Sequence, residues 1–152
     1  MSFDRELPIV YAALHNGDFV IFDYNTEKII GRQKIDATPY SAQCMTAHPA
    51  GEIVVVANMS LITLFDFKRK RVFKQLGQKV NRIYNMAYDP TGKYLAVATD
   101  KLQLKIWDLT LNKVVDSIPA FFPCEFTPDG KSIIAMTYQI KCGITNKIIT
   151  QV

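Results

Sequence analysis

The sequence contains few of the residues from which metal sites and many active sites are built. It has three cysteines and two histidines in 152 residues. Cys44, Cys124 and Cys142 are odd in number and widely spaced, and no CxxC pair occurs. Neither His15 nor His48 belongs to HExxH or to another zinc-spaced pair. We therefore expect no metal site, and we interpret the cysteines as reduced, partly buried structural thiols.

Motifs for cofactor binding and for nucleophilic catalysis are also missing. The sequence has no GxSxG, Walker A or GxGxxG motif. Its acidic residues are scattered. Asp23, Asp66 and Asp108 recur because they follow predicted strands, so a structural role explains them better than a catalytic one. These absences predict a chain that is not an enzyme and that needs no cofactor.

Long hydrophobic runs are absent as well. No apolar stretch approaches the roughly 20 residues of a membrane-spanning helix. Residues 1–6 contain no basic segment followed by an apolar run, so we expect no secretory signal. Hydrophobic residues make up 49% and charged residues 21% of the chain, which is typical of a soluble globular protein. We expect an intracellular protein, nuclear or cytoplasmic, with no membrane partner.

The sequence does contain a four-strand pattern that recurs about every 40 residues. Its clearest copy runs from Tyr84 to Val115. The anchors of each copy are turn prolines at Pro49, Pro90 and Pro128, strand-closing residues Asp23, Asp66 and Asp108, and basic residues Lys28, Arg71 and Lys113. Several matching anchors per copy predict the blades of a β-propeller, an all-β fold.

The turns and strands of one copy follow from residue type. The predicted turns between first and second strands are 48–51, 89–92 and 127–130. In each, Pro presets φ and Gly accepts a positive φ at the exit. The second strands, 53–57, 94–98 and 132–136, are continuously apolar, which predicts burial on both faces. Asn16-Gly17 suits a tight hairpin between the second and third strands of the first copy.

One segment is similar to a WD40 repeat without gaps: Leu95–Asp108, which ends in Ile106-Trp107-Asp108. Phe22-Asp23 and Phe65-Asp66 resemble conservative replacements of the Trp-Asp pair. The resemblance covers about residues 7–152. It departs from the family in three ways: no Gly-His precedes a first strand, Lys101 stands at the usual turn Asp, and Cys142 replaces the Asp of the fourth copy. The hydrogen-bonded tetrad of strong WD repeats (His, Ser/Thr, Asp, Trp) is therefore incomplete in every blade.

This resemblance implies a β-propeller of the WD40 type with four-stranded antiparallel blades. We expect residues 1–152 to form a single partial domain with blades at about 7–34, 40–76, 82–118 and 121–152, or about three and three-quarter blades of an incomplete ring. Residues 1–7 look too short and polar for a first strand, and Lys147–Ile149 read as a last fourth strand. The uncovered ends predict a homodimer, packing on further blades, or a chain that is part of a longer protein.

The resemblance also implies a non-catalytic scaffold for protein–protein interactions within a larger intracellular complex. The expected partner-binding residues lie around one rim: Pro39, Tyr40, Asn58, Met59, Arg82, Lys101, Phe121 and Phe122. Two alternatives stay open, which are a non-WD propeller enzyme or subunit of the lactonase or dehydrogenase kind, and an RNA-binding module of a ribonucleoprotein assembly.

The charge is mildly basic, at +4. Its one concentration is Lys68-Arg69-Lys70-Arg71, in a predicted turn between third and fourth strands. A solvated turn is the simplest interpretation, and a nuclear-localisation tract or an RNA contact is the alternative. Lys79 and Arg82 are expected at the opposite rim, which argues against one continuous nucleic-acid groove. We expect Tyr84 and Tyr88 in strand packing rather than in a base-stacking platform.

Overall fold

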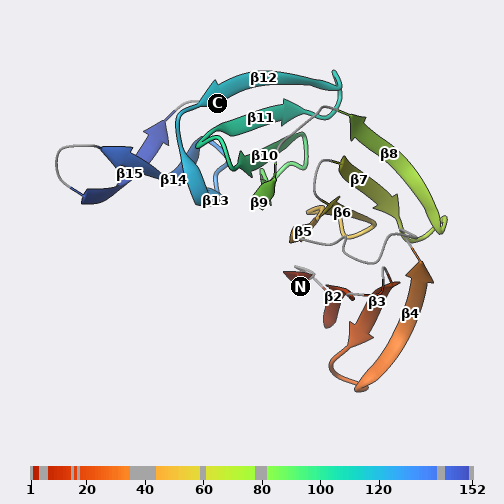
Figure 1. Cartoon of the computed structure of the whole chain (residues 1–152). Helices are drawn as coiled ribbons and strands as arrows, with labels where there is room; N and C mark the ends of the chain where they lie inside the picture. The colour runs from red at the N-terminus through yellow and green to blue at the C-terminus, as the bar shows by residue number, and fades with distance from the viewer. Residues whose placement is uncertain are drawn as a thin grey trace. The chain divides into compact units, whose positions relative to one another are not determined.

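The computed structural model describes residues 2–3, 7–14, 16, 18–34, 44–58, 61–77, 82–139 and 143–150 (Figure 1). The regular elements among these residues are all β-strands. None of the described residues belongs to a helix long and apolar enough to cross a membrane. The chain divides into two compact units, Met1–Val80 and Asn81–Val152, and each is described by itself.

The first unit holds two four-stranded antiparallel sheets. The strands of one are β1 (Ser2–Phe3), β2 (Ile9–Ala13), β3 (Asp18–Asp23) and β4 (Lys28–Lys34). The strands of the other are β5 (Cys44–Ala47), β6 (Ile53–Asn58), β7 (Leu61–Asp66) and β8 (Arg71–Gly77). The prediction that the first copy lacks its first strand is wrong, because Ser2 pairs with Tyr11 and Phe3 with Val10. Backbone groups make this pairing, so two residues suffice whatever their side chains.

The second unit holds a four-stranded sheet and a three-stranded sheet. The strands of the first are β9 (Ile83–Tyr88), β10 (Tyr94–Thr99), β11 (Leu104–Asp108) and β12 (Lys113–Ile118). The strands of the second are β13 (Phe121–Phe126), β14 (Ser132–Gln139) and β15 (Gly143–Thr150). The prediction of a fourth strand at Lys147–Ile149 is wrong. These residues continue β15, which pairs with β14 along its whole length, so no turn separates a third strand from a fourth.

The proline turns lie where the sequence predicts them, between β5 and β6, β9 and β10, and β13 and β14. In each turn the glycine has a φ of 70–77°. Its N–H donates to the carbonyl oxygen three residues earlier, at 2.8–3.0 Å. A positive φ costs an ordinary residue conformational strain that glycine avoids. The recurring Pro and Gly therefore set the hairpins that join first and second strands. The Asn16 turn also joins β2 to β3 as predicted, although Gly17 lies outside the described residues.

The core of the first unit forms between its two sheets. Buried Tyr11 and Phe19 from one sheet pack with Val54 from the other. The ring centroid of Phe67 lies 4.4 Å from that of Phe19 and 5.8 Å from that of Tyr11. The hydroxyl of Tyr11 donates to the carbonyl oxygen of Gly51 at 2.8 Å. Aromatic contacts and this hydrogen bond thus connect consecutive sheets.

The core of the second unit brings β11 and β14 together. Leu104 and Ile106 pack in one cluster with Ile133 and Ala135. The predicted burial of second strands holds for β6, in which 54–57 are buried, and for β10, in which 95–99 are buried. It is wrong for β14, because Ile134 is 44% exposed. Among residues 132–136 of β14, whose side chains are described, Ile133 and Ala135 are buried and Ile134 is exposed, which is an alternating pattern.

Candidate interaction surface

The recurring aspartates hold the turns that follow the third strands. Asp23, Asp66 and Asp108 end β3, β7 and β11. Oδ1 of each accepts hydrogen bonds from backbone N–H groups two or three residues later, at 2.8–3.2 Å. The residue four positions after each aspartate has a φ of 50–55°: Glu27, Lys70 and Asn112. These aspartates therefore have the structural role that their positions predict.

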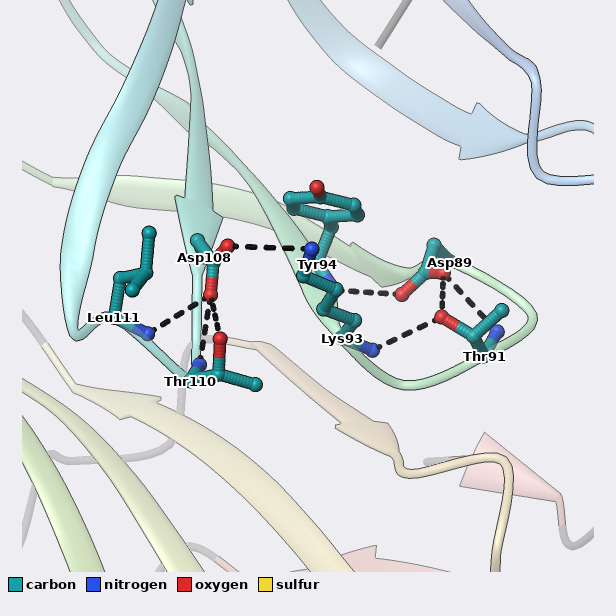
Figure 2. Close-up of polar contacts among 7 residues, drawn as sticks. All are labelled: Asp89, Thr91, Lys93, Tyr94, Asp108, Thr110 and Leu111. Carbon is teal, nitrogen blue, oxygen red and sulfur yellow. Dashed lines mark hydrogen bonds and ion pairs between the residues drawn. The ribbon is translucent and has the colours of Figure 1, made fainter.

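Figure 2 shows this arrangement at Asp108. Oδ1 of Asp108 accepts hydrogen bonds from the N–H and the hydroxyl of Thr110 and from the N–H of Leu111, at 2.6–2.9 Å. Its Oδ2 lies 3.7 Å from Nζ of Lys93. The Thr110 hydroxyl, followed by these other donors, holds the pKa of Asp108 below its usual range. The carboxylate is therefore charged at neutral pH, and its Oδ1 is hydrogen-bonded to residues of the turn that follows it.

A second buried carboxylate holds the proline turn at the same end of this sheet (Figure 2). Oδ1 of Asp89 accepts from the N–H of Tyr94 at 2.6 Å, and Oδ2 accepts from the N–H and the hydroxyl of Thr91. Nζ of Lys93 lies 4.7 Å from the centroid of the Tyr94 ring. These contacts provide hydrogen-bond partners for two carboxylates that are each only 3% exposed.

The basic run Lys68–Arg71 occupies the β7–β8 turn, as predicted, and begins β8. Nζ of Lys68 lies 3.0 Å from Oε1 of Glu52, and Nη1 of Arg69 lies 2.7 Å from Oδ2 of Asp66. The Arg69 guanidinium holds the pKa of Asp66 below its usual range. Two of the four cations thus have carboxylate partners, which favours the solvated turn over a phosphate-binding patch.

Predicted rim residues come together at the opposite end of the β9–β12 sheet. Arg82 precedes β9, and its carbonyl oxygen accepts from the N–H of Asp100 in the β10–β11 turn, at 3.0 Å. Lys101 follows Asp100 and is exposed. The Arg82 guanidinium lies 5.8 Å from the ring centroid of Tyr84. Leu102, with a φ of 54°, is 55% exposed. We name Arg82, Tyr84, Lys101 and Leu102 the Arg82 patch.

Two members of this patch were not expected from the sequence. Tyr88 is buried as predicted, but the prediction for Tyr84 is wrong, because Tyr84 is 41% exposed. Alternation alone would place these two side chains, four residues apart, on the same face of β9. The register shift between β9 and β10 pairs Asn85 with Ala98 and Ile83 with Thr99, so Tyr84 lies in a bulge without a partner, which explains its exposure. Leu102 was missed because a leucine with positive φ has no sequence signal.

The other predicted rim residues are less completely described. Asn58 ends β6, and Phe121 and Phe122 begin β13, but their side chains lie outside the described residues. Pro39, Tyr40 and Met59 lie outside them entirely, as do His15, Lys79 and Cys142. Partner binding by all eight predicted residues stays a prediction. In the described part of the chain, no three His, Cys, Asp or Glu side chains come close enough to hold a metal ion.

Trp107 and the two described cysteines, Cys44 and Cys124, are wholly or partly buried. Trp107 is 3% exposed, and its Nε1 has no hydrogen-bond partner among the described residues. The hydroxyl of Thr99, in the neighbouring strand β10, donates to the carbonyl oxygen of Gln103 at 3.2 Å. Both N–H and Sγ of Cys124 donate to Oδ1 of Asn85, at 2.9 and 3.0 Å, which connects β13 to β9. Burial raises the pKa of the Cys44 thiol to about 12.

Comparison with known families identifies the repeat. The family described as the anaphase-promoting complex subunit 4 WD40 domain matches residues 48–141, which is more than half of the chain. The chain belongs to the WD40-repeat family. The predicted fold class, a partial WD40-type β-propeller built of antiparallel sheets, is thereby confirmed.

Individual relatives of this WD40 chain are much longer proteins. It is 28% identical over 127 residues to U3 small nucleolar RNA-associated protein 21 of Saccharomyces cerevisiae, which covers 81% of this chain and 13% of that protein. It is 23% identical over 140 residues to the Schizosaccharomyces pombe homolog, covering 90% and 15%. It is 30% identical over 70 residues to telomerase protein component 1 of Rattus norvegicus, covering 45% and 3%. The chain thus spans only about a seventh of the length of the two yeast relatives.

Proposed function

We propose that this WD40 chain is a non-catalytic scaffold that binds other proteins within a larger assembly. The observation that carries this proposal is the Arg82 patch. It places a guanidinium, an aromatic ring, an ammonium group and an exposed leucine at one end of a sheet whose strands β10 and β11 are buried. Arg and Tyr are frequent anchors of protein interfaces. A rigid sheet that presents them lowers the conformational entropy lost on binding.

The proposed setting is a nuclear assembly that contains RNA. The names of the two yeast relatives describe them as associated with a small nucleolar RNA, and the name of the rat relative describes a telomerase component. This WD40 chain would contribute protein contacts to such an assembly. Direct RNA binding is the second candidate, and the ion pairs of Lys68 and Arg69 count against it because they reduce the positive charge available to phosphate.

The role we propose for the acidic residues is structural. Asp89 and Asp108 accept hydrogen bonds from the turns that they hold. An enzymatic propeller would use a convergent set of acid, base or metal ligands. Elemental analysis of the purified chain tests this rival: a stoichiometric metal that is retained through gel filtration would favour the enzyme.

The test of the scaffold uses the tagged chain expressed in eukaryotic cells, with retained proteins quantified before and after ribonuclease treatment. The patch variant combines Lys101→Glu with Leu102→Ser. The matched control is Lys131→Glu, which makes the same charge change at an exposed residue in the turn between β13 and β14. We expect the patch variant to lose specific partners, the control to keep them, and ribonuclease to have little effect. Loss of all partners on ribonuclease treatment would favour the RNA-binding module instead.

A further inference from the structure

The fourth strands of the three four-stranded sheets, β4, β8 and β12, each contain a β-bulge at the same place. In β4, β8 and β12 one residue has no partner in the ladder, because the register shifts opposite the third strand. The unpaired residues are Ile30, Phe73 and Val115. All three are apolar, and they are 55%, 53% and 43% exposed. A bulge bends an edge strand and interrupts its ladder, which blunts the strand as a template for adding another strand.

The bulge accounts for the interrupted backbone ladder of β8, but it does not account for an exposed phenylalanine at Phe73. Charged side chains and proline are common means of protecting an exposed edge strand. In β8, Val72 is 44% exposed and lies directly beside Phe73. Lys70 and Arg71 precede this pair and are both exposed. We name Lys70, Arg71, Val72 and Phe73 the β8 patch.

Charge distinguishes β8 from the other two fourth strands. In β12, Asp116 follows the bulge directly, so the strand carries one acidic and one basic residue. In β4, the pair Ile29 and Ile30 is comparably exposed, but Glu27 stands beside Lys28 where β8 has Lys70 beside Arg71. The guanidinium of Arg32 in β4 lies 2.7 Å from Oδ2 of Asp18. In the described part of the chain, no carboxylate lies within 4 Å of the cationic groups of Lys70 and Arg71. The acids of this turn, Glu52 and Asp66, form their ion pairs with Lys68 and Arg69, while Arg71, opposite Asp66 in the ladder, interacts with that carboxylate only through longer-range charge.

We propose that the β8 patch binds a segment of another protein that carries apolar side chains flanked by carboxylates. The two exposed apolar side chains select apolar partners, and the cations beside them complement acidic ones. The bulge at Phe73 disfavours simple strand addition, so side chains carry the recognition. RNA is disfavoured as the occupant. Its phosphates would contact the cations of the turn and would leave the exposed apolar side chains of Val72 and Phe73 without a partner. This inference rests on the proposed scaffold function and assigns it a second surface, distinct from the Arg82 patch.

The experiment measures fluorescence anisotropy of a labelled synthetic peptide, Asp-Glu-Phe-Leu-Asp-Glu, titrated with the whole chain. A peptide with serine in place of Phe and Leu, and a single-stranded oligouridine of similar charge, are the comparison probes. Phe73→Ser removes the apolar anchor, and Lys70→Asn with Arg71→Gln removes the charge. The matched control is Val115→Ser, which makes the corresponding change at the bulge of β12. Thermal unfolding confirms that each variant folds, and Val72→Ser replaces Phe73→Ser if that variant does not.

We expect saturable peptide binding that weakens about tenfold or more in Phe73→Ser and is unchanged in Val115→Ser. Binding to the charge variant should be weaker and should depend less on salt between about 50 and 200 mM. Equal losses in Phe73→Ser and Val115→Ser, no saturable binding of the peptide, or preferential binding of oligouridine would overturn the proposal. The partners retained through the Arg82 patch would be unaffected by such a result, so it would leave the scaffold function standing.

Discussion

Trp107 offers a sharp test of the packing described above, because it is the single tryptophan of the chain and is 3% exposed. It lies near the end of β11, an inner strand of its sheet, opposite Leu95 of β10 and Val114 of β12. Trp107→Ala would leave a cavity in a closely packed site, and such changes cost about 3–5 kcal/mol. A domain of this size is stable by about 5–15 kcal/mol, so the substitution should remove a large fraction of the free energy of unfolding.

The measurement is urea denaturation followed by far-UV circular dichroism, since the variant has no indole to report its own unfolding. Leu111→Ala is the matched control, because Leu111 lies in the turn of the same β11–β12 hairpin and is 60% exposed. It should change stability by less than about 0.5 kcal/mol. In the unmodified chain, Trp107 fluorescence should be blue-shifted and poorly quenched by acrylamide. A freely quenched indole, or equal effects of the two substitutions, would refute the packing.

Three further predictions concern backbone strain, a thiol and a carboxylate. Gly130→Ala should destabilise the chain by about 1–2 kcal/mol in urea, because φ is +70° and the new Cβ would lie 3.2 Å from Cδ of Pro90; an unchanged midpoint would contradict this. The Cys44 thiol, whose pKa burial raises to about 12, should react with a disulfide reagent at about pH 8 far more slowly in the native chain than in about 6 M urea; equal rates would show that it is not buried. The pKa of Asp108 is lowered in the folded state, so its contribution to stability is present above the usual value of 3.8 and is lost as pH falls through the folded-state pKa. Asp108→Asn should therefore make acid unfolding less steep, as measured by circular dichroism, and an unaltered acid profile would argue against the network.

The Arg82 patch shows which surface residues could be predicted from the sequence and which could not. Arg82 and Lys101 were expected on one rim because the WD40 resemblance places the connections between blades and the turns between second and third strands there. Tyr84 was expected in the core because aromatic residues in strands usually pack. Its exposed position beside the Arg82 guanidinium follows from the register shift between β9 and β10, which leaves Tyr84 without a partner in the ladder. Exposure of this kind is a property of the assembled sheet, and the local sequence of β9 does not carry it.

The basic run illustrates the same limit for charge. Four consecutive cations, Lys68–Arg71, suggested either a solvated turn or a phosphate contact. The choice between these depends on Glu52. This residue is distant from the run in sequence, yet its Oε1 lies 3.0 Å from Nζ of Lys68. Hairpin pairing of β6 and β7 brings the two together. The distinction between paired and available cations therefore required the tertiary structure.

The elements that the sequence alone determined are those with local causes. Proline and glycine specify the turns before β6, β10 and β14 through their own φ preferences, and each strand-closing aspartate holds the turn beside it through its own carboxylate. The repeat of these local devices was enough to establish the fold class. The tertiary structure alone decided the outcome where pairing joins distant segments. Backbone hydrogen bonds recruited Ser2–Phe3 as β1, a continuous hairpin extended β15 through Lys147–Ile149, and packing left Ile134 exposed between two buried neighbours. Pairing and burial depend on what lies opposite a residue, and no residue encodes its opposite neighbour by itself.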